Sequence, residues 1–338
     1  MLIFTIVSLL MIISCSRGTI NNKKDAKVQF NLNIPKIAMP TPLPKADGEI
    51  DAEVVISEIF VLVFDEKYRL SEIVEGDNLS HQSGVTSFNA RISSSKKPAT
   101  LILVANVNFR RYSVSIGSSM EMVIPALKMS YTISGITSLL PMSGVVSLAS
   151  VEAGTHNVSV EMLRSIARAD VIVQADNFVL VDARIYRANS SIQLIPSESN
   201  SIDWLNPAVT LPSVPSESGL TINGTIPVAA DEQTNSIEAK LYLPEAFGVE
   251  PGDASISIIV GGYYNGSNTL SYYRIDFKGG ISGHPYGQIL RNHKYIFNIK
   301  SVYNQGRNTP ELAANNEATD VEAQIKEWKD HITYIESD

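Results

Sequence analysis

The segment Lys27-Val28-Gln29-Phe30-Asn31-Leu32-Asn33-Ile34 alternates polar and apolar residues without a break. Successive side chains of a β-strand point to opposite faces of a sheet, so this period of two predicts a strand with one buried face. The apolar face would consist of Val28, Phe30, Leu32 and Ile34. Burial of each such side chain contributes about 1.5–3 kcal/mol, or about 6–12 kcal/mol together as an upper estimate. One strand would then contribute as much free energy as the net stability of a domain.

Strand patterns recur along the rest of the chain. Near-continuous apolar, β-branched runs at 54–64 and 101–105 predict central strands covered on both faces. Period-two segments follow at 158–162, 171–173 and 256–260, and Asn265-Gly266 between the runs 256–264 and 270–277 predicts a hairpin turn. Helix is compatible only with short segments, at 120–128 and within 203–211. The pattern predicts an all-β protein built from β-sandwiches.

The length of 338 residues exceeds the usual size of one hydrophobic core and predicts two domains in tandem. We expect an N-terminal sandwich at 26–157, with its first strand at 27–34 and an exposed loop at 35–53. A C-terminal sandwich would follow at 158–338, because the strand pattern restarts after a glycine-containing turn at 153–156. The Pro- and Ser-rich interval 196–218 is an alternative linker, but its length also suits a connection inside one sandwich.

The N-terminus carries an apolar run at 2–13, shorter than the ~20 residues that a membrane-spanning helix needs. It ends in Ile12-Ile13-Ser14-Cys15, the pattern of a bacterial lipobox. We therefore expect a signal peptide at 1–14, a lipid on Cys15 and a lipidated tether at 15–25. The run lacks a preceding Lys or Arg, and an ordinary signal peptide with an incidental cysteine is the alternative. Because Cys15 is the only cysteine, the mature fold can hold no internal disulfide.

Motifs that carry chemistry are absent from the sequence. It has no nucleophile elbow, no His-Glu-x-x-His helix, no phosphate-binding glycine loop and no dinucleotide fingerprint. Its five histidines are scattered, and the formal charge of -8 disfavours nucleic acid as a partner. We expect no enzymatic activity, no cofactor and no metal ion, although two carboxylates placed by the fold would suffice for a glycosidase. The pairs Tyr263-Tyr264 and Tyr272-Tyr273 could stack on sugars or form cross-strand pairs.

Several stretches, in their joint order, resemble the fimbrillins, the type V pilin subunits of Bacteroidota. They are the lipobox at Cys15, the strands 59–65 and 101–106, Arg164-x-x-x-Arg168 before an apolar strand, Tyr242-Leu243-Pro244-Glu245, Arg291-Asn292-His293-Lys294-Tyr295 and Ile325-Lys326-Glu327-Trp328. The resemblance implies two β-sandwich domains of the transthyretin-like Greek-key type with few short helices. It also implies a lipoprotein precursor in the outer membrane, proteolytic removal of the first strand, and strand exchange between subunits in a surface fimbrium that serves adhesion.

A donor strand would come from the tail at 320–336, where Val321, Ala323, Ile325 and Trp328 supply apolar residues. The polar stretch 306–319 before it would act as a hinge, although the tail equally fits an ordinary final strand. The partners would be other copies or related pilin subunits, a processing protease, and a ligand on a host or bacterial surface.

The expected processing loop departs from the fimbrillin pattern because it contains no arginine. Its only basic residues are Lys36 and Lys45, which are the candidate cleavage sites. Either the protease accepts lysine, or it cuts elsewhere, or the subunit is not cut. An uncut anchor or accessory fimbrial subunit and a glycan-binding surface lipoprotein are therefore the alternative functions.

Overall fold

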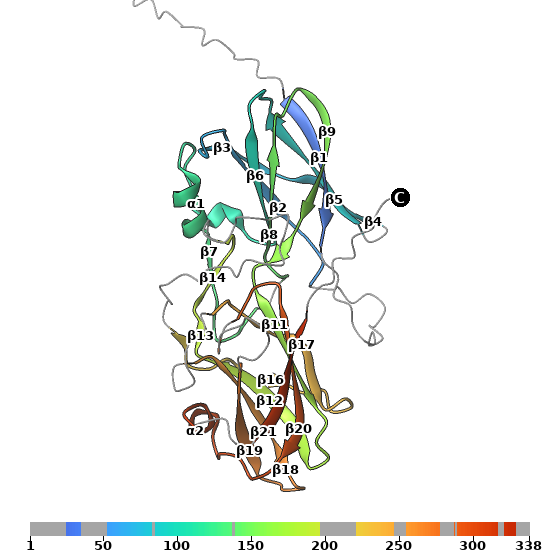
Figure 1. Ribbon diagram of the computed structural model, residues 1–338, viewed down its shortest axis with the longest axis vertical. Helices are drawn as coiled ribbons and strands as arrows, with labels where there is room; N and C mark the ends of the chain where they lie inside the picture. Colours follow the sequence, from blue (N-terminus) through green and yellow to red (C-terminus); the bar gives the residue numbers. More distant parts are fainter. Residues whose placement is uncertain are drawn as a thin grey trace, which may run out of the picture.

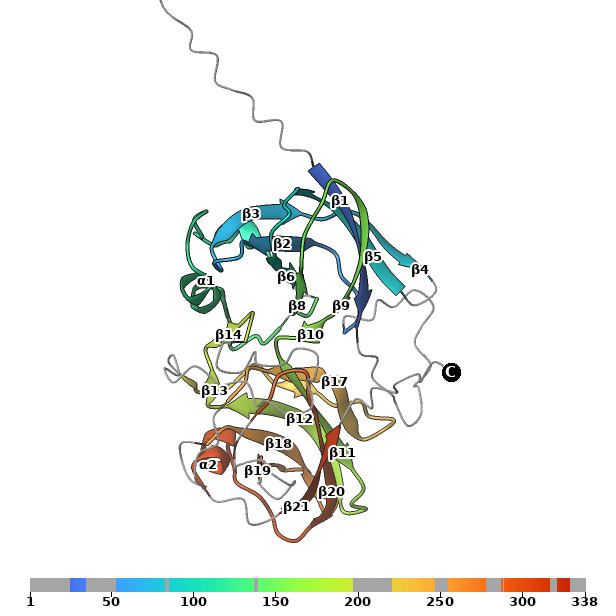
Figure 2. The ribbon, with the colours of Figure 1, turned by 45° about the horizontal axis from the view of Figure 1, so that its top comes forward.

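A computed structural model describes residues 25–34, 53–82, 85–136, 139–196, 221–246, 255–277, 287, 289–316 and 321–328. These residues form two β-sandwiches that follow one another along the long axis of the molecule (Figure 1). The two α-helices lie on the same side of the molecule in both views (Figures 1 and 2). The predicted all-β fold of two tandem sandwiches with few short helices is confirmed.

The first sandwich consists of a four-stranded and a five-stranded sheet. The four-stranded sheet has the order β4 (Asp77–Gln82), β5 (Val85–Ser93), β1 (Asp25–Asn33), β9 (Gly154–Glu161). The other sheet has the order β10 (Leu163–Arg164), β8 (Met142–Leu148), β6 (Ala99–Ala105), β2 (Ile59–Phe64), β3 (Leu70–Glu75). As the apolar runs predict, β2 and β6 are buried along nearly their whole length, and they pair with each other in the middle of this sheet.

The second sandwich consists of two four-stranded sheets. One has the order β17 (Ser236–Leu243), β11 (Ala167–Val173), β20 (Lys294–Val302), β21 (Val321–Trp328). The other has the order β16 (Val228–Ala229), β12 (Phe178–Tyr186), β18 (Ser257–Tyr264), β19 (Leu270–Asp276). The predicted hairpin joins β18 to β19, and Asn265 and Gly266 both have positive φ, as the turn chemistry requires.

The two sandwiches repeat one topology that the sequence does not reveal. In the first, β1 pairs antiparallel with β5 and parallel with β9. In the second, β11 pairs antiparallel with β17 and parallel with β20. The correspondence ends at the next position, because β20 has β21 on its other side while β9 ends its sheet.

The predicted domain boundary after residue 157 requires a correction. It falls inside β9, whose residues pair with β1 from Ala26↔Gly154 to Asn33↔Glu161. The chain passes from the first sandwich to the second between β10 and β11. It also returns, because β14 (Ser191–Gln193) pairs with β7 (Lys128–Ser130) of the N-terminal half. A strand pattern locates strands but not the sheet to which each belongs, so the sequence could not place this junction.

Helices cover the outer faces of the sheets in two places. The helix α1 (Met120–Ala126) lies within the predicted helical segment 120–128 and packs on the outer face of β2 and β6. The helix α2 (Pro310–Ala314) covers the outer face of β18 and β19, and this is why Arg274 and Asp276 are buried although they point away from the core. A short 3-10 turn, Phe109–Arg111, and a two-stranded ribbon of β13 (Ala188–Asn189) with β15 (Thr221–Ile222) complete the described structure. Residues 203–211 lie outside the described range.

A bulge in β17 holds Ala239 at φ 53°, a left-handed conformation that the Cβ atom of an L-residue disfavours by roughly 1–2 kcal/mol. We expect Ala239→Gly to raise the free energy of unfolding by about 0.5–1 kcal/mol, because glycine removes this strain at some entropic cost. The matched control is Ala229→Gly at another exposed strand position without positive φ, which should lower stability. Urea unfolding of both variants measures the difference, and an equal loss of stability in the two would contradict the assignment of strain to Ala239.

Candidate functional site

The strand β1 lies in the interior of its sheet and not at an edge. Its burial alternates along the whole strand, as the sequence predicts, with Val28 and Phe30 completely buried and Leu32 at 4% exposure. The ring of Phe30 stacks on Phe88 of β5 with centroids 4.7 Å apart. Ile34 follows the strand and is half-buried against the same core. The apolar face predicted from the period of two is therefore the face that packs against the core.

Both neighbours of β1 pair with it along nearly its whole length. The register runs from Asp25↔Ser93 to Leu32↔Thr86 on the β5 side, and from Ala26↔Gly154 to Asn33↔Glu161 on the β9 side. At its end the Asn33 side-chain amide donates to both carboxylate oxygens of Glu161, at 2.7 and 2.8 Å. Removal of β1 would leave two unpaired strand edges and an apolar groove between them.

The predicted cleavage loop lies mostly beyond what the structure describes. Cys15, Lys36 and Lys45 are all outside the described residues, so their predicted roles stay predictions. The end of the predicted exposed loop is different, because Glu53 is only 6% exposed. The chain is thus already held by the fold at residue 53.

Residues 53–58, which we call the anchored segment, are tied to the fold by several hydrogen bonds. The side chain of Asn106 donates to the carbonyl of Val55 at 2.8 Å and accepts from the backbone N–H of Ser57 at 2.9 Å. His81 Nε2 lies 2.9 Å from the carbonyl oxygen of Ile56, whose side chain is buried. Asn106 adopts positive φ, which asparagine tolerates better than most residues. The Asn that follows the predicted strand 101–105 therefore holds the chain next to the loop.

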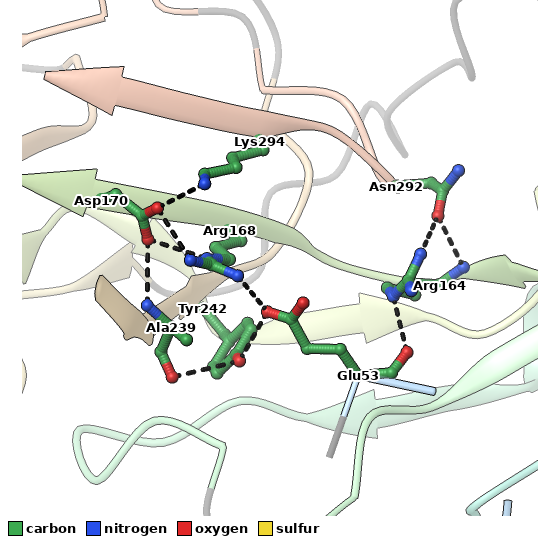
Figure 3. A network of polar contacts seen from close by, with 8 residues as sticks. All are labelled: Glu53, Arg164, Arg168, Asp170, Ala239, Tyr242, Asn292 and Lys294. Atoms are coloured by element: carbon green, nitrogen blue, oxygen red, sulfur yellow. Dashed lines mark hydrogen bonds and ion pairs between the residues drawn. The ribbon is translucent and has the colours of Figure 1, made fainter. Parts of the chain in front are cut away.

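Glu53 belongs to a buried network of charges at the junction of the two sandwiches (Figure 3). Its carboxylate accepts from Arg168 Nη1 at 2.8 Å and from the Tyr242 hydroxyl at 2.9 Å, and its backbone carbonyl accepts from Arg164 Nε at 2.8 Å. These partners come from β11, β17 and β10 respectively. A residue before β2 is thereby bound to both sheets that meet at the junction.

Asp170 balances the positive charges of this network. Its carboxylate accepts from Arg168 at 2.7 and 2.8 Å, from Lys294 at 2.8 Å and from the backbone N–H of Ala239 at 3.0 Å. Burial by itself lowers the pKa of Arg168, but hydrogen bonds to Asp170 and the nearby carboxylates raise that pKa above its ordinary value. Burial, reinforced by the charge of Glu53, raises the pKa of Tyr242, so the phenol stays protonated and donates.

A second ion pair at the junction joins Arg291 to Glu245. The guanidinium donates to the two carboxylate oxygens at 2.9 and 2.6 Å and also to the carbonyls of Gln193 and Leu194. Gln193 in turn donates to the carbonyl of Ile124 at the end of α1. The stretches that carry the sequence resemblance around Arg164, Tyr242 and Arg291 thus meet here, and their polar side chains are buried or part-buried and hydrogen-bonded.

A small cavity lies beside this network, and its lining includes Glu53, Arg164, Arg168, Tyr242, His293 and Lys294. Each of these polar side chains is hydrogen-bonded or ion-paired within the protein. Because this polar lining is already paired, the cavity is a packing feature of the junction.

Among the described residues no group of three His, Cys, Asp or Glu side chains is placed to hold a metal ion. No described helix is long and apolar enough to span a bilayer.

The strand β21 contains the predicted donor residues Val321, Ala323, Ile325 and Trp328. It pairs antiparallel with β20 of its own chain, from Lys294↔Trp328 to Val302↔Val321. The predicted hinge before it is largely ordered: Arg307 exchanges two backbone hydrogen bonds with Tyr272, at 2.8 and 2.9 Å, and α2 follows at once. Described residues 306–316 are therefore packed on β18 and β19 and do not form the flexible connection that their polar composition predicts.

The first prediction from this site concerns the core contact of β1. Phe30→Ala should lower the free energy of unfolding by about 3–5 kcal/mol, because it removes a fully buried ring and leaves a cavity beside Phe88. Gln29→Ala, at the exposed neighbouring position, should change it by no more than about 0.5 kcal/mol. Urea unfolding compares the two, and similar small effects would mean that β1 is not packed as described.

The second prediction concerns Glu53. Glu53→Ala should lower the free energy of unfolding by about 3 kcal/mol, because Arg168 keeps only Asp170 as a carboxylate partner and Tyr242 keeps only the carbonyl of Ala239, at 3.2 Å, as an acceptor. Glu53→Gln keeps an acceptor oxygen and should lower it by less. The control Glu232→Ala, on the surface, should have almost no effect in the same unfolding measurement. Equal values for Glu53→Ala and Glu232→Ala would rule out a structural role of the network.

No protein-family model and no curated protein matches the sequence. Solved structures do: a candidate cell adhesion protein from Parabacteroides distasonis ATCC 8503 has 16% identity and a TM-score of 0.59 over 89% of this chain and 97% of that one. The tip fimbrial protein Mfa3 from Porphyromonas gingivalis, with a C-terminal truncation, has 16% identity and a TM-score of 0.54 over 90% and 100%. A candidate cell adhesion protein from Bacteroides eggerthii DSM 20697 has 13% identity and a TM-score of 0.53 over 90% and 95%. The chain therefore shares its fold with fimbrial and cell adhesion proteins of Bacteroidota, and the resemblance to fimbrillins is confirmed at the level of the fold.

Proposed function

We propose that this protein is a subunit of a surface fimbrium that serves cell adhesion, and that it joins the fibre by exchange of its first strand. The observation that carries the proposal is the position of β1 between β5 and β9 with an apolar face turned into the core. The shared fold with a fimbrial protein and with candidate adhesion proteins supports the same function. The role is structural and needs no catalytic residue or cofactor.

A cut in the loop after β1 would release the strand from its covalent connection to the rest of the fold. The vacated groove would expose apolar residues of the core and the unpaired edges of β5 and β9, and a strand from another subunit would bury both. The free energy at stake is that of the buried face of β1, about 6–12 kcal/mol as an upper estimate. Exchange of one strand for another therefore supplies a strong and specific link between subunits.

The anchored segment supports this mechanism because it lies between the loop and the rest of the molecule. Hydrogen bonds from Asn106, Arg164 and Arg168 hold residues 53–58 independently of β1. A cut at Lys36 or Lys45 would then leave the junction of the sandwiches intact. The subunit would lose one strand and keep its shape.

Before assembly the precursor would be held in the outer membrane by a lipid on Cys15, and a surface protease would release it into the fimbrium. The loop offers this protease only lysines, Lys36 and Lys45, and no arginine. That departure favours a second candidate, an anchor or accessory subunit that is not cut and keeps its lipid. The two candidates differ in whether residues 16–45 remain attached after assembly.

Limited trypsin treatment of the mature chain tests the displaceable strand. We expect cleavage at Lys36 or Lys45, identified by N-terminal sequencing, and we expect the cut protein to take up a fluorescent peptide of residues 25–34 as the cut strand dissociates in mild denaturant. The matched control, Lys36→Gln with Lys45→Gln, should stay uncut in the loop and exclude the peptide. Fluorescence anisotropy follows the uptake. Equal uptake by cut and uncut protein, or none by either, would overturn the proposal.

A further inference from the structure

Two features of the described fold are candidates for strand exchange. The groove under β1 is the candidate acceptor, and the tail strand β21 is the candidate donor. If the chain formed a fibre from identical copies, β21 of one copy would have to replace β1 of the next. This requires that β21 is free to leave and that its sequence fits the groove.

The groove under β1 has four inward positions of distinct size. They are occupied in order by Ala26, Val28, Phe30 and Leu32, which are between 0% and 4% exposed. The third position is the largest, because the Phe30 ring fills it and stacks on Phe88. The fourth position, at Leu32, is as closed to water as a core site. A replacement strand in the direction of β1 must therefore supply four alternating apolar residues with a bulky one third.

The tail does not supply this pattern in any register. With Val321 in the first position, Ala323 and Ile325 follow, but Glu327 takes the buried fourth position. A carboxylate buried there is unfavourable, because the polar residue opposite this position, Thr86 of β5, is already hydrogen-bonded to His81. If Val321 takes the second position instead, Glu327 lies outside the groove. Ala323 then takes the third position, where Phe30 stood, and its small side chain leaves a cavity. Every register further along the tail brings at least one polar or charged residue into the groove, namely Lys326, Lys329, Asp330, His331 or Glu336.

The tail strand is also well secured in its own chain. β21 is paired along the length of β20, whose Tyr295, Phe297 and Ile299 are buried. The carbonyl of Ala314, at the end of α2, accepts hydrogen bonds from Arg274 at 2.7 Å and from Arg187 at 2.9 Å. Only residues 317–320 separate the described end of this packed region from β21, and the five Cα steps across them span at most ~18 Å. β21 would have to unpair from β20 before it could reach another subunit.

From this mismatch and this pairing, and resting on the proposed function, we infer that the subunit accepts a donor strand but does not supply one. The occupant of the groove is a strand of a different protein with four alternating apolar residues, the third of them aromatic. β21 is a resident strand of the second sandwich and closes the edge of β20. The protein then sits at one end of a heteropolymer and not in a run of identical copies.

The test is a competition between peptides for trypsin-cut protein that carries a fluorescent peptide of residues 25–34. The unlabelled 25–34 peptide should displace the probe, and its Phe30→Ala version should do so at least tenfold less well. The tail peptide 319–336 should compete at least a hundredfold more weakly than the 25–34 peptide. The same tail peptide with Ile325→Phe and Glu327→Leu should regain at least tenfold, because it then matches the groove.

The outcomes separate a subunit that only accepts a strand from a homopolymer, and both from a protein without strand exchange. Equal competition by the native tail peptide, or ladders of cut protein alone in size-exclusion chromatography, would overturn the inference and favour a homopolymer. Failure of the 25–34 probe itself to bind would overturn the proposed strand exchange, and the inference with it. Weak competition by the native tail, recovery by the substituted tail and a monomeric cut protein together support an acceptor subunit.

Discussion

The parallel pairing of β1 with β9 is the contact on which the first sandwich depends. Strands β2 to β8 lie between these two strands in the sequence, so β1 and β9 can pair only when the intervening chain has folded between them. Parallel neighbours need such a crossover, whereas antiparallel ones can be joined by a tight turn. The first described segment of the chain is thereby built into the middle of a sheet. A strand at an edge could be lost with little consequence, but loss of β1 opens the sheet.

The charges at the junction explain how a molecule with such a strand can keep its shape. Glu53, Arg168, Asp170 and Lys294 are almost completely buried, and buried charges are tolerated only when they are paired and hydrogen-bonded. This network, with the Arg291–Glu245 pair, joins the loop end, both sandwiches and the β7–β14 ribbon. The network therefore includes the chain from residue 53 onward. The strand before the loop is held by its sheet, and the chain after the loop is held by the junction.

Because the two sandwiches share a topology, the roles of the first and last described strands, β1 and β21, can be compared. β1 and β11 occupy equivalent places, but β11 carries residues of the junction network, whereas β1 is held by its sheet and by its apolar face in the core. At the next position β20 is covered by β21, whereas the edge of β9 that faces away from β1 has no strand beside it among the described residues. The tail thus completes the second sandwich, and the N-terminal strand is the element whose removal creates a binding site.

The sequence by itself determined the all-β class, the inward face of β1, the central strands β2 and β6 and the β18–β19 hairpin. These features depend on local rules: the period of two, continuous β-branched runs and the positive φ of Asn265-Gly266. Only the tertiary structure decided that β9 belongs to the first sandwich, that 306–316 is packed, and that Glu53 is buried against Arg168. Each of these depends on contacts between residues far apart in the chain, and a one-dimensional pattern carries no information on which distant segment a strand or a charge will meet. Arg164, Tyr242 and Arg291 stood out in the sequence as parts of the resemblance, but their common role at the junction appears only when the fold brings them together.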